Sequence, residues 1–198
     1  MNKALKTLFA VGIVGVIWEL MHILTQGVGI PSILTTVTNT VDIFPLLMEH
    51  LLVSAIRLLI GLFLALLIGG VIGSLMARYK AVDELLAPLV YLVTPLPKVA
   101  FLPIMMVIFG ISETARIAVL VFVVVFQFIL GIRDALKSMP QTHILSMKSL
   151  ALSNGSQFKD IILPYSLPYL FTSLRQAFGM SLAVLFFLET FVNQKGIG

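Results

Sequence analysis

The chain of 198 residues has no cysteine and few charged residues. Without cysteine, disulfides, thiolate metal sites and cysteine nucleophiles are excluded. Charged residues make up 11% of the chain, whereas a soluble domain carries about 25%. Since 59% of the residues are hydrophobic, most of the surface must face lipid, and the composition predicts an integral membrane protein.

The signatures of three enzyme classes are also missing. No G-x-x-x-x-G-K-[ST] is present, so the chain does not bind ATP through a P-loop. No serine lies in a G-x-S-x-G, and His22, His50 and His143 are far apart with no H-E-x-x-H between any of them. A membrane-embedded enzyme would need catalytic groups clustered at one depth. We therefore expect no catalytic residue, no metal site and no cofactor on this chain.

Apolar segments long enough to cross a membrane recur along the chain. The first follows Lys3 and Lys6 in the manner of a signal peptide, but it continues beyond signal-peptide length and no small-x-small site closes it, so we expect an uncleaved helix. Barrel-like alternation is absent, which predicts helices and an all-α membrane protein with one domain over residues 1–198. The five predicted spans are Leu5–Leu24, Leu51–Ala77, Leu85–Gly110, Ala115–Ile132 and Leu167–Val192.

Lysine and arginine are distributed unevenly between the two sides of these spans. With the N-terminus inside, the outer segments carry only Arg116 and Lys195. The positive-inside rule therefore predicts a cytoplasmic N-terminus and a cytoplasmic segment at 137–164. In the first outer loop we expect a short interfacial helix near Val41–His50. The inner segments carry Lys3, Lys6, Arg78, Lys80, Arg133, Lys137, Lys148 and Lys159.

Two of the predicted spans contain unusual residues. Gly69 and Gly73 form a G-x-x-x-G, which permits close approach of another helix, either in this chain or in a second membrane subunit. The third span is interrupted by Pro95, Pro97 and Lys98. Proline removes a backbone donor and breaks a helix, and broken helices often mark the pathway of a transporter.

The polar segment from Pro140 to Pro164 has helical spacing of its own. Pro140 is suited to start a helix, and Ser153 or Ser156 can cap a second helix over Gln157–Leu163. Two interpretations remain open from the residues alone, a helix that docks in a groove of a partner and a linker helix that lies along the membrane. The apolar positions of the first helix are Ile144, Met147, Leu150 and Ala151.

The second half of this segment, SLALSNGSQFKDIILP, resembles the cytoplasmic loop of ABC-transporter permease subunits of the binding-protein-dependent type. The family pattern is E-A-A, three residues, Gly, nine residues, Ile, one residue, Leu-Pro. Ile161, Leu163 and Pro164 hold its last three places, whereas the Glu-Ala-Ala falls at residues 145–147 and the glycine at Ala151, which differ from the pattern. The resemblance implies a coupling helix that fits a cleft on a cytoplasmic ATPase. The implied ATPase-coupling residues are Ser149, Leu150, Ala151, Leu152, Ser153, Phe158, Ile161, Leu163 and Pro164.

Further motifs resemble the nitrate, sulfonate and taurine subgroup of these permeases. They are the run from Pro95 to Pro103, Phe109-Gly110-Ile111 with Glu113, Leu167-Pro168-Tyr169, and Gly196-Ile197-Gly198. The resemblance implies a type I importer fold, two permease copies, two separate ATPase subunits, an external binding protein and a bacterial inner membrane. Permeases of this subgroup have a sixth span after the Gly-Ile-Gly, where this chain stops, so a fragment and a natural, non-functional truncation remain open.

Charges at membrane depth are the remaining functional candidates. Pro95, Pro97, Lys98 and Arg175 are candidates for the pathway, and the two cations would suit a small anion such as a sulfonate, taurine or nitrate. Glu189 is a candidate for an outer-face contact, with a cap-like position at the surface, and Arg57 is expected to extend toward the membrane surface. An ATP-independent carrier or channel is the alternative function; it predicts internal repeats, which the sequence does not show.

Overall fold

The computed structural model describes residues 3–110, 112–149, 153–192 and 196. These residues form helices and no strand, which confirms the predicted all-α membrane fold. The chain divides into two compact units, Met1–Leu51 and Leu52–Gly198, and each is described by itself. The expectation of one domain over the whole chain stays a prediction.

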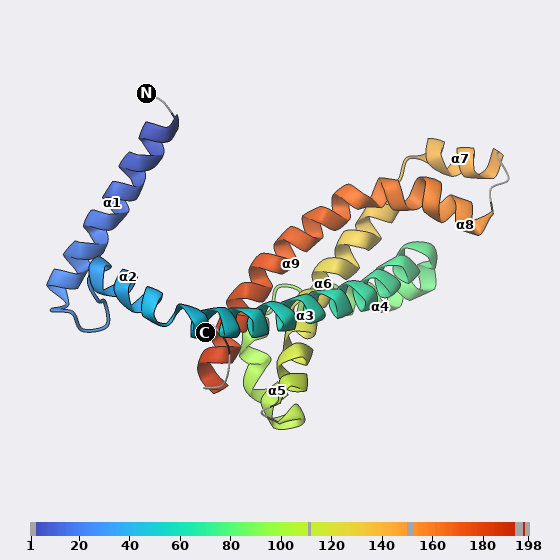
Figure 1. The fold of residues 1–198 in the computed structure, drawn as a ribbon. Helices are drawn as coiled ribbons and strands as arrows, with labels where there is room; N and C mark the ends of the chain where they lie inside the picture. Colours follow the sequence, from blue (N-terminus) through green and yellow to red (C-terminus); the bar gives the residue numbers. More distant parts are fainter. Residues whose placement is uncertain (1–2, 111, 150–152, 193–195, 197–198) are drawn as a thin grey trace. The chain divides into compact units, whose positions relative to one another are not determined.

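The first unit contains α1 (Lys3–Leu24) and α2 (Ile33–Asp42), as Figure 1 shows. Helix α1 confirms the first predicted span. The short helix expected near Val41–His50 is wrong in position, because Ser32 caps α2 by accepting a hydrogen bond from the Thr35 amide at 3.1 Å. The following residues belong instead to the first turns of α3, which begins at Phe44.

Most of α3 lies in the second unit, where α6 ends and α9 begins beside the short helices α7 and α8 (Figure 1). Among the described residues, four helical stretches are long and apolar enough to cross a membrane: α1, α3, α6 and the stretch Gln157–Thr190 that includes most of α9. The bounds are α3 (Phe44–Arg78), α4 (Lys80–Val93), α5 (Leu102–Phe109), α6 (Glu113–Lys137), α7 (Gln141–Ser149), α8 (Asn154–Ser156) and α9 (Leu163–Val192).

The third predicted span is divided, as its prolines indicated. Helix α4 ends at Val93, a 3₁₀ turn covers Lys98–Phe101, and α5 follows. Pro95 and Pro97 lie in the gap, where their missing N–H groups cannot continue a helical hydrogen-bond ladder. The interruption is confirmed, and no single helix runs over Leu85–Gly110.

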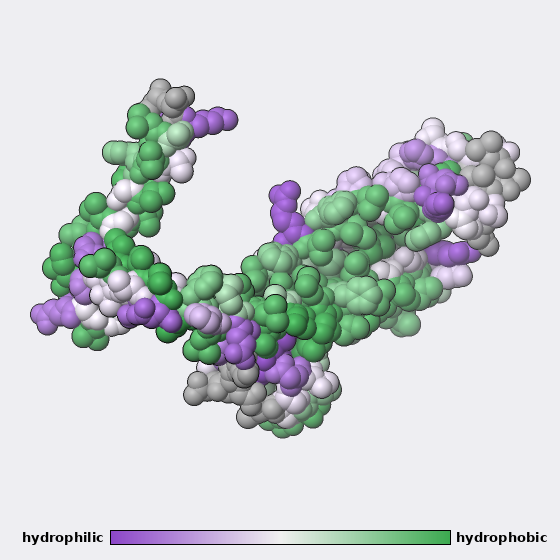
Figure 2. Space-filling view, viewed as in Figure 1, coloured by the Kyte–Doolittle hydropathy of each residue, from purple (hydrophilic) through white to green (hydrophobic). Residues whose placement is uncertain are grey.

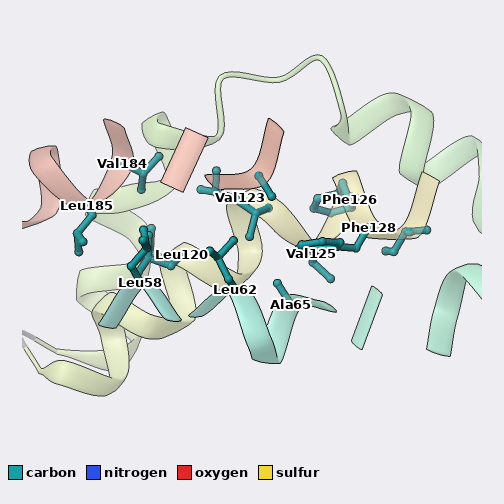
Figure 3. Packing of buried hydrophobic residues seen from close by; sticks show 14 of the residues in the cluster. Leu58, Leu62, Ala65, Leu120, Val123, Val125, Phe126, Phe128, Val184 and Leu185 are labelled. Carbon is teal, nitrogen blue, oxygen red and sulfur yellow. The ribbon is translucent and has the colours of Figure 1, made fainter. Parts of the chain in front are cut away.

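Helix α6 forms the centre of the second unit. Twelve of its 25 residues are buried, and Figure 3 shows its Leu120 and Val123 packed between side chains of α3 and α9. A Cβ placed on Gly69 would lie 2.6 Å from the Phe128 Cβ, and one on Gly73 would lie 2.6 Å from the Ile129 carbonyl oxygen. The G-x-x-x-G therefore packs α3 against α6 within this chain, which decides between the two alternatives for that contact.

The surface of the second unit is sharply divided by polarity. Apolar residues cover the visible faces of α3 and α9, whereas polar residues gather around α7 and α8 (Figure 2). Exposed apolar side chains along the long helices suit contact with lipid. The polar residues around α7 and α8 suit contact with water at the membrane boundary.

Candidate functional site

Between α6 and α9 the structure has the first predicted helix, α7, whereas the next helix, α8, begins at Asn154, inside the predicted turn, and not at Gln157. Pro140 directly precedes α7. The Ser156 amide donates to the Ser153 hydroxyl at 3.3 Å, which makes Ser153 the cap of α8. A π-helical stretch, Gln157–Ile162, then leads into α9. Of the predicted coupling residues, Leu150, Ala151 and Leu152 lie outside the described residues.

The two ends of the 137–164 segment, called the coupling loop below after its predicted role, are tied together by aromatic residues. The Tyr165 hydroxyl donates to the Ser138 carbonyl at 3.0 Å, so the start of α9 is bonded to the end of α6. The Tyr165 ring lies 5.7 Å from that of His143 on α7 and 5.8 Å from that of Tyr169, between centroids. Tyr165 therefore contacts α7 while it bonds the start of α9 to the end of α6.

Among the described residues of this loop, large apolar side chains are exposed at Leu145, Phe158 and Leu163. Leu145 on α7 is 57% exposed, and Phe158 in the π-helical stretch is 56% exposed. Ser149 and Ser153 are exposed, Ile161 is half-buried, and Leu163 and Pro164 are exposed in the first turn of α9. Phe158 and Leu163 also line an open groove beside α3, whereas Leu145 does not.

The same end of α6 is clamped to α4 by ion pairs. The Arg133 guanidinium donates to the Asp83 carboxylate at 2.5 and 3.1 Å, and Lys137 binds the same carboxylate. Arg133 also donates to the Tyr91 hydroxyl at 2.9 Å. The hydrogen bonds from Arg133 and then Lys137 lower the pKa of Asp83 to about 2. This clamp joins the base of the coupling loop to the helix that leads into the broken segment.

The four pathway candidates lie in different surroundings. Lys98 is buried; its ammonium donates to the Thr94 carbonyl at 2.8 Å and lies 5.6 Å from the centroid of the Phe126 ring. Arg175 is exposed on α9, and Pro95 and Pro97 are exposed in the gap before the 3₁₀ turn. Lys98 and Arg175 thus do not share one environment in this chain.

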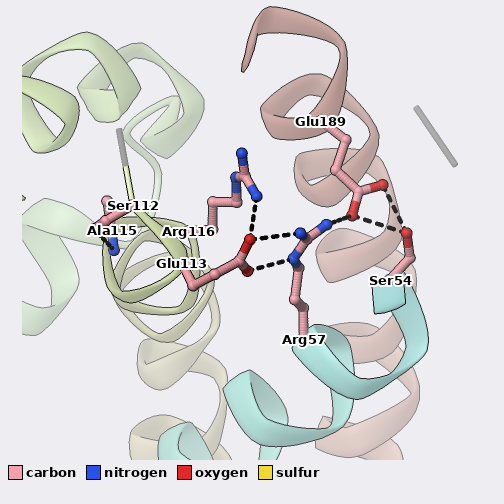
Figure 4. Close-up of polar contacts among 7 residues, drawn as sticks. All are labelled: Ser54, Arg57, Ser112, Glu113, Ala115, Arg116 and Glu189. Carbon is pink, nitrogen blue, oxygen red and sulfur yellow. Dashed lines mark hydrogen bonds and ion pairs between the residues drawn. The ribbon is translucent and has the colours of Figure 1, made fainter. Parts of the chain in front are cut away.

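At the other end of the unit, the structure brings together a charged cluster that the sequence had not revealed (Figure 4). Arg57 of α3 donates to both Glu113 oxygens at 2.6 Å and to Glu189 at 2.6 Å. Arg116 donates to Glu113 at 2.5 Å, and the Ser54 hydroxyl donates to Glu189 at 2.8 Å. Two guanidinium groups thus meet two carboxylates, and the formal charges cancel.

The burial of this cluster corrects three expectations. The side chain of Glu189 has no exposed area, so its expected position at the surface is wrong, although an outer-face role stays a prediction. The side chain of Arg57 is 5% exposed and does not extend to the membrane surface. Arg116, counted with an outer segment, is buried in α6. The buried carboxylate of Glu189 needs a partner, which Arg57 supplies, whereas the side chain of Glu113 is 56% exposed.

The sequence contains one indication of this cluster, which is the depth of its charged residues in the predicted spans. Arg57, Glu113 and Glu189 all fall near the predicted outer ends of their spans, where an unpaired charge would be costly. Among the described residues, no group of three His, Cys, Asp or Glu side chains is placed to hold a metal ion. The ion pairs of the cluster join α3, α6 and α9.

The family model for the binding-protein-dependent transport system inner membrane component matches residues 65–198. This chain belongs to that family. The match confirms the resemblance drawn from the loop, and it covers α4 to α9 with the coupling loop, the Asp83 clamp and Glu189.

Individual relatives of the family are permease proteins from bacteria. The chain is 32% identical over 152 residues to the taurine transport system permease protein TauC of Escherichia coli, covering 77% of this chain and 55% of TauC. It is 23% identical over 210 residues to the nitrate import permease protein NrtB of Synechocystis, covering 99% and 75%. The bicarbonate transport system permease protein CmpB of Synechococcus elongatus is 28% identical over 128 residues, covering 65% and 46%. The chain thus spans about half of TauC and CmpB and three quarters of NrtB.

Proposed function

We propose that this chain is the permease subunit of an ATP-driven importer and that it forms the path of a small anion through a bacterial inner membrane. The observation that carries the proposal is the coupling loop. It presents the exposed Leu145 of α7 on a polar end, and the Tyr165–Ser138 bond ties its two ends together. A loop built in this way suits the docking and the movement of a cytoplasmic ATPase.

The geometry supports a route for the motion. An ATPase that moves α7 also moves the ends of α6 and α9, because Tyr165 contacts both His143 and Ser138. From α6 the Arg133–Asp83 clamp carries the displacement to α4, which leads to the broken segment beside Lys98. Hydrolysis of ATP takes place in the separate ATPase subunits; a second permease copy and an external binding protein complete the proposed assembly. The N-terminus is cytoplasmic in this proposal.

The proposed substrate class is a small anion. The relatives are named for taurine, nitrate and bicarbonate, each of which carries an anionic group. Lys98 and Arg175 are the cations proposed to attract the anion. Since Lys98 lies at the helix break and Arg175 on the exposed side of α9, they would act at successive points of the pathway.

Crosslinking from the coupling loop tests the ATPase contact. The chain has no cysteine, so Leu145→Cys labelled with a benzophenone maleimide gives a single photocrosslinker on α7. Leu34→Cys, on the exposed face of α2, is the matched control. We expect a P-loop ATPase to be captured from native membranes by the first variant and not by the second. A folded, abundant chain that captures no ATPase from Leu145 would contradict the proposal.

Uptake measurements test the substrate class. In cells that hold the complete transporter, uptake of labelled taurine and nitrate is compared for wild type, Lys98→Gln with Arg175→Gln, and the control Lys80→Gln, which removes an exposed charge elsewhere. We expect the double variant to lose uptake and the control to keep it. Uptake that survives in the double variant would overturn the role of these cations, and uptake that persists without the ATPase would identify an ATP-independent carrier.

A further inference from the structure

An open groove lies between the inner part of α3, the end of α6 and the start of α9. Its volume is about 560 Å³, and its wall includes Leu67, Val71 and Leu75 of α3. Phe158 and Leu163 close the wall from the side of the coupling loop. The volume falls in the range of sites for small ligands, about 300–1,000 Å³.

The length of the groove corresponds to one leaflet of a bilayer. Along α3 its wall runs from Leu66 to Arg78, which at 1.5 Å per residue is about 18 Å. Half of the hydrocarbon core of a bilayer is about 15 Å deep.

The polarity of the groove changes along its length. The deep end is lined by Leu66, Leu67 and Val71, and the other end by Ser74, Arg78 and Tyr79. The fitting occupant is therefore an amphiphile, with an apolar tail and a polar head.

Arg78 gives this end of the groove a positive charge. The side chain is exposed, its guanidinium lies 5.7 Å from the centroid of the Tyr79 ring, and within the described part of the chain it forms no ion pair. In the predicted orientation Arg78 lies at the cytoplasmic leaflet, where anionic lipids are concentrated. Basic residues beside grooves between helices on this side of a membrane suit acidic headgroups.

We propose that this groove binds one acyl chain of an anionic phospholipid, with the headgroup phosphate at Arg78. The tail lies along Leu67, Val71 and Leu75, and its end near the headgroup touches Phe158 and Leu163. The bound lipid thus supports the π-helical stretch at the base of the coupling loop. This inference does not depend on the transport function.

Lipid binding to the purified full chain is the test. The delipidated chain is titrated in detergent with phosphatidylglycerol or phosphatidylcholine of the same acyl chains, and native mass spectrometry gives the dissociation constants. Arg78→Gln removes the proposed phosphate ligand, Ser74→Phe fills the groove, and Lys80→Gln removes a neighbouring charge outside it. Circular dichroism verifies that each variant is folded.

We expect tighter binding of phosphatidylglycerol than of phosphatidylcholine. Arg78→Gln weakens the binding of phosphatidylglycerol about fivefold, as for one basic residue at a membrane surface, whereas Lys80→Gln leaves it unchanged. Ser74→Phe abolishes the binding of both lipids at this site. Equal weakening by Arg78→Gln and Lys80→Gln would show attraction to the surface in general and would overturn the proposal.

Two further measurements separate the lipid from other occupants. In phosphatidylglycerol nanodiscs, hydrogen exchange over residues 157–163 is expected to be slower than in phosphatidylcholine, and Ser74→Phe should remove this difference. Equal exchange in the two lipids would contradict the proposal. A disulfide between two copies of the Val71→Cys variant, formed in high yield, would place a second copy in the groove and would also overturn it.

Discussion

Replacing Gly73 by alanine tests whether backbone contact between α3 and α6 holds the second unit together. The new Cβ would lie 2.6 Å from the Ile129 carbonyl oxygen, whereas ordinary contacts begin at 3.4 Å, so the helices must separate by about 0.8 Å. Overpacking of this kind costs about 1–3 kcal/mol, and since a backbone atom cannot rotate away, we expect the upper part of that range.

Gly70→Ala is the matched control for this substitution. Gly70 lies on the same helix, and its Cβ would meet only the Ile132 Cδ1, at 3.5 Å, which is ordinary contact. Both variants gain about 1 kcal/mol of helix propensity, so their difference isolates the clash and should be about 2–3 kcal/mol. For a chain of this size the difference corresponds to about 5–10 °C in Tm.

Thermal unfolding of both variants in the same detergent or nanodisc, followed by circular dichroism, measures this difference. We expect Gly70→Ala to melt at or slightly above wild type and Gly73→Ala clearly below it. Equal melting temperatures for the two alanine variants would refute the close contact between α3 and Ile129 and, with it, the assignment of the G-x-x-x-G to packing within the chain.

Three further predictions concern polar contacts. Glu189→Ala leaves Arg57 buried without one carboxylate and should lower the free energy of unfolding by about 3–5 kcal/mol. The control Glu84→Ala, from an exposed ion pair, should change the free energy of unfolding by less than about 1 kcal/mol. Equal effects of the two substitutions would contradict the buried cluster. Asp83→Asn removes a carboxylate whose pKa is about 2, below the ordinary 3.8, so the stabilisation by this carboxylate is complete above about pH 4 and is lost toward pH 2. The difference in Tm between the variant and wild type should therefore be constant from pH 7 to 5. A difference that disappears within that interval would refute the clamp. Ser153→Ala removes the cap of α8, and hydrogen exchange at residues 154–162 should become about fivefold faster for a loss of about 1 kcal/mol; unchanged exchange would show that Ser153 does not hold this helix.

Local chemistry explains why much of the fold could be predicted from the sequence. Pro95 and Pro97 divide the third span because proline cannot donate a backbone hydrogen bond, whatever lies around it. Pro140 and Ser153 mark the starts of α7 and α8 for the same kind of local reason. The short helix α2 begins earlier than expected, because Ser32 caps it directly before Ile33.

The charged cluster could not be predicted in this way, because its members meet only through packing. Arg57 is 56 residues from Glu113 and 132 residues from Glu189 in the sequence. Considered singly, each is a charge near the end of a span, and extension toward the membrane surface is the ordinary expectation for it. The close contact at Gly69 and Gly73 fixes α3 beside α6, and the packing of α9 against α6 adds Glu189.

The bridging position of Arg57 also has a consequence for biogenesis. During synthesis α3 emerges first, α6 next and α9 last, so Arg57 can pair with Glu113 well before Glu189 exists. When α9 enters the bilayer, its carboxylate finds a guanidinium and the Ser54 hydroxyl already in place, and a helix that would be expensive to insert alone gains a receptor inside its own chain. The order of the helices along the chain thus favours assembly, because the partner of Glu189 is synthesised before Glu189 itself.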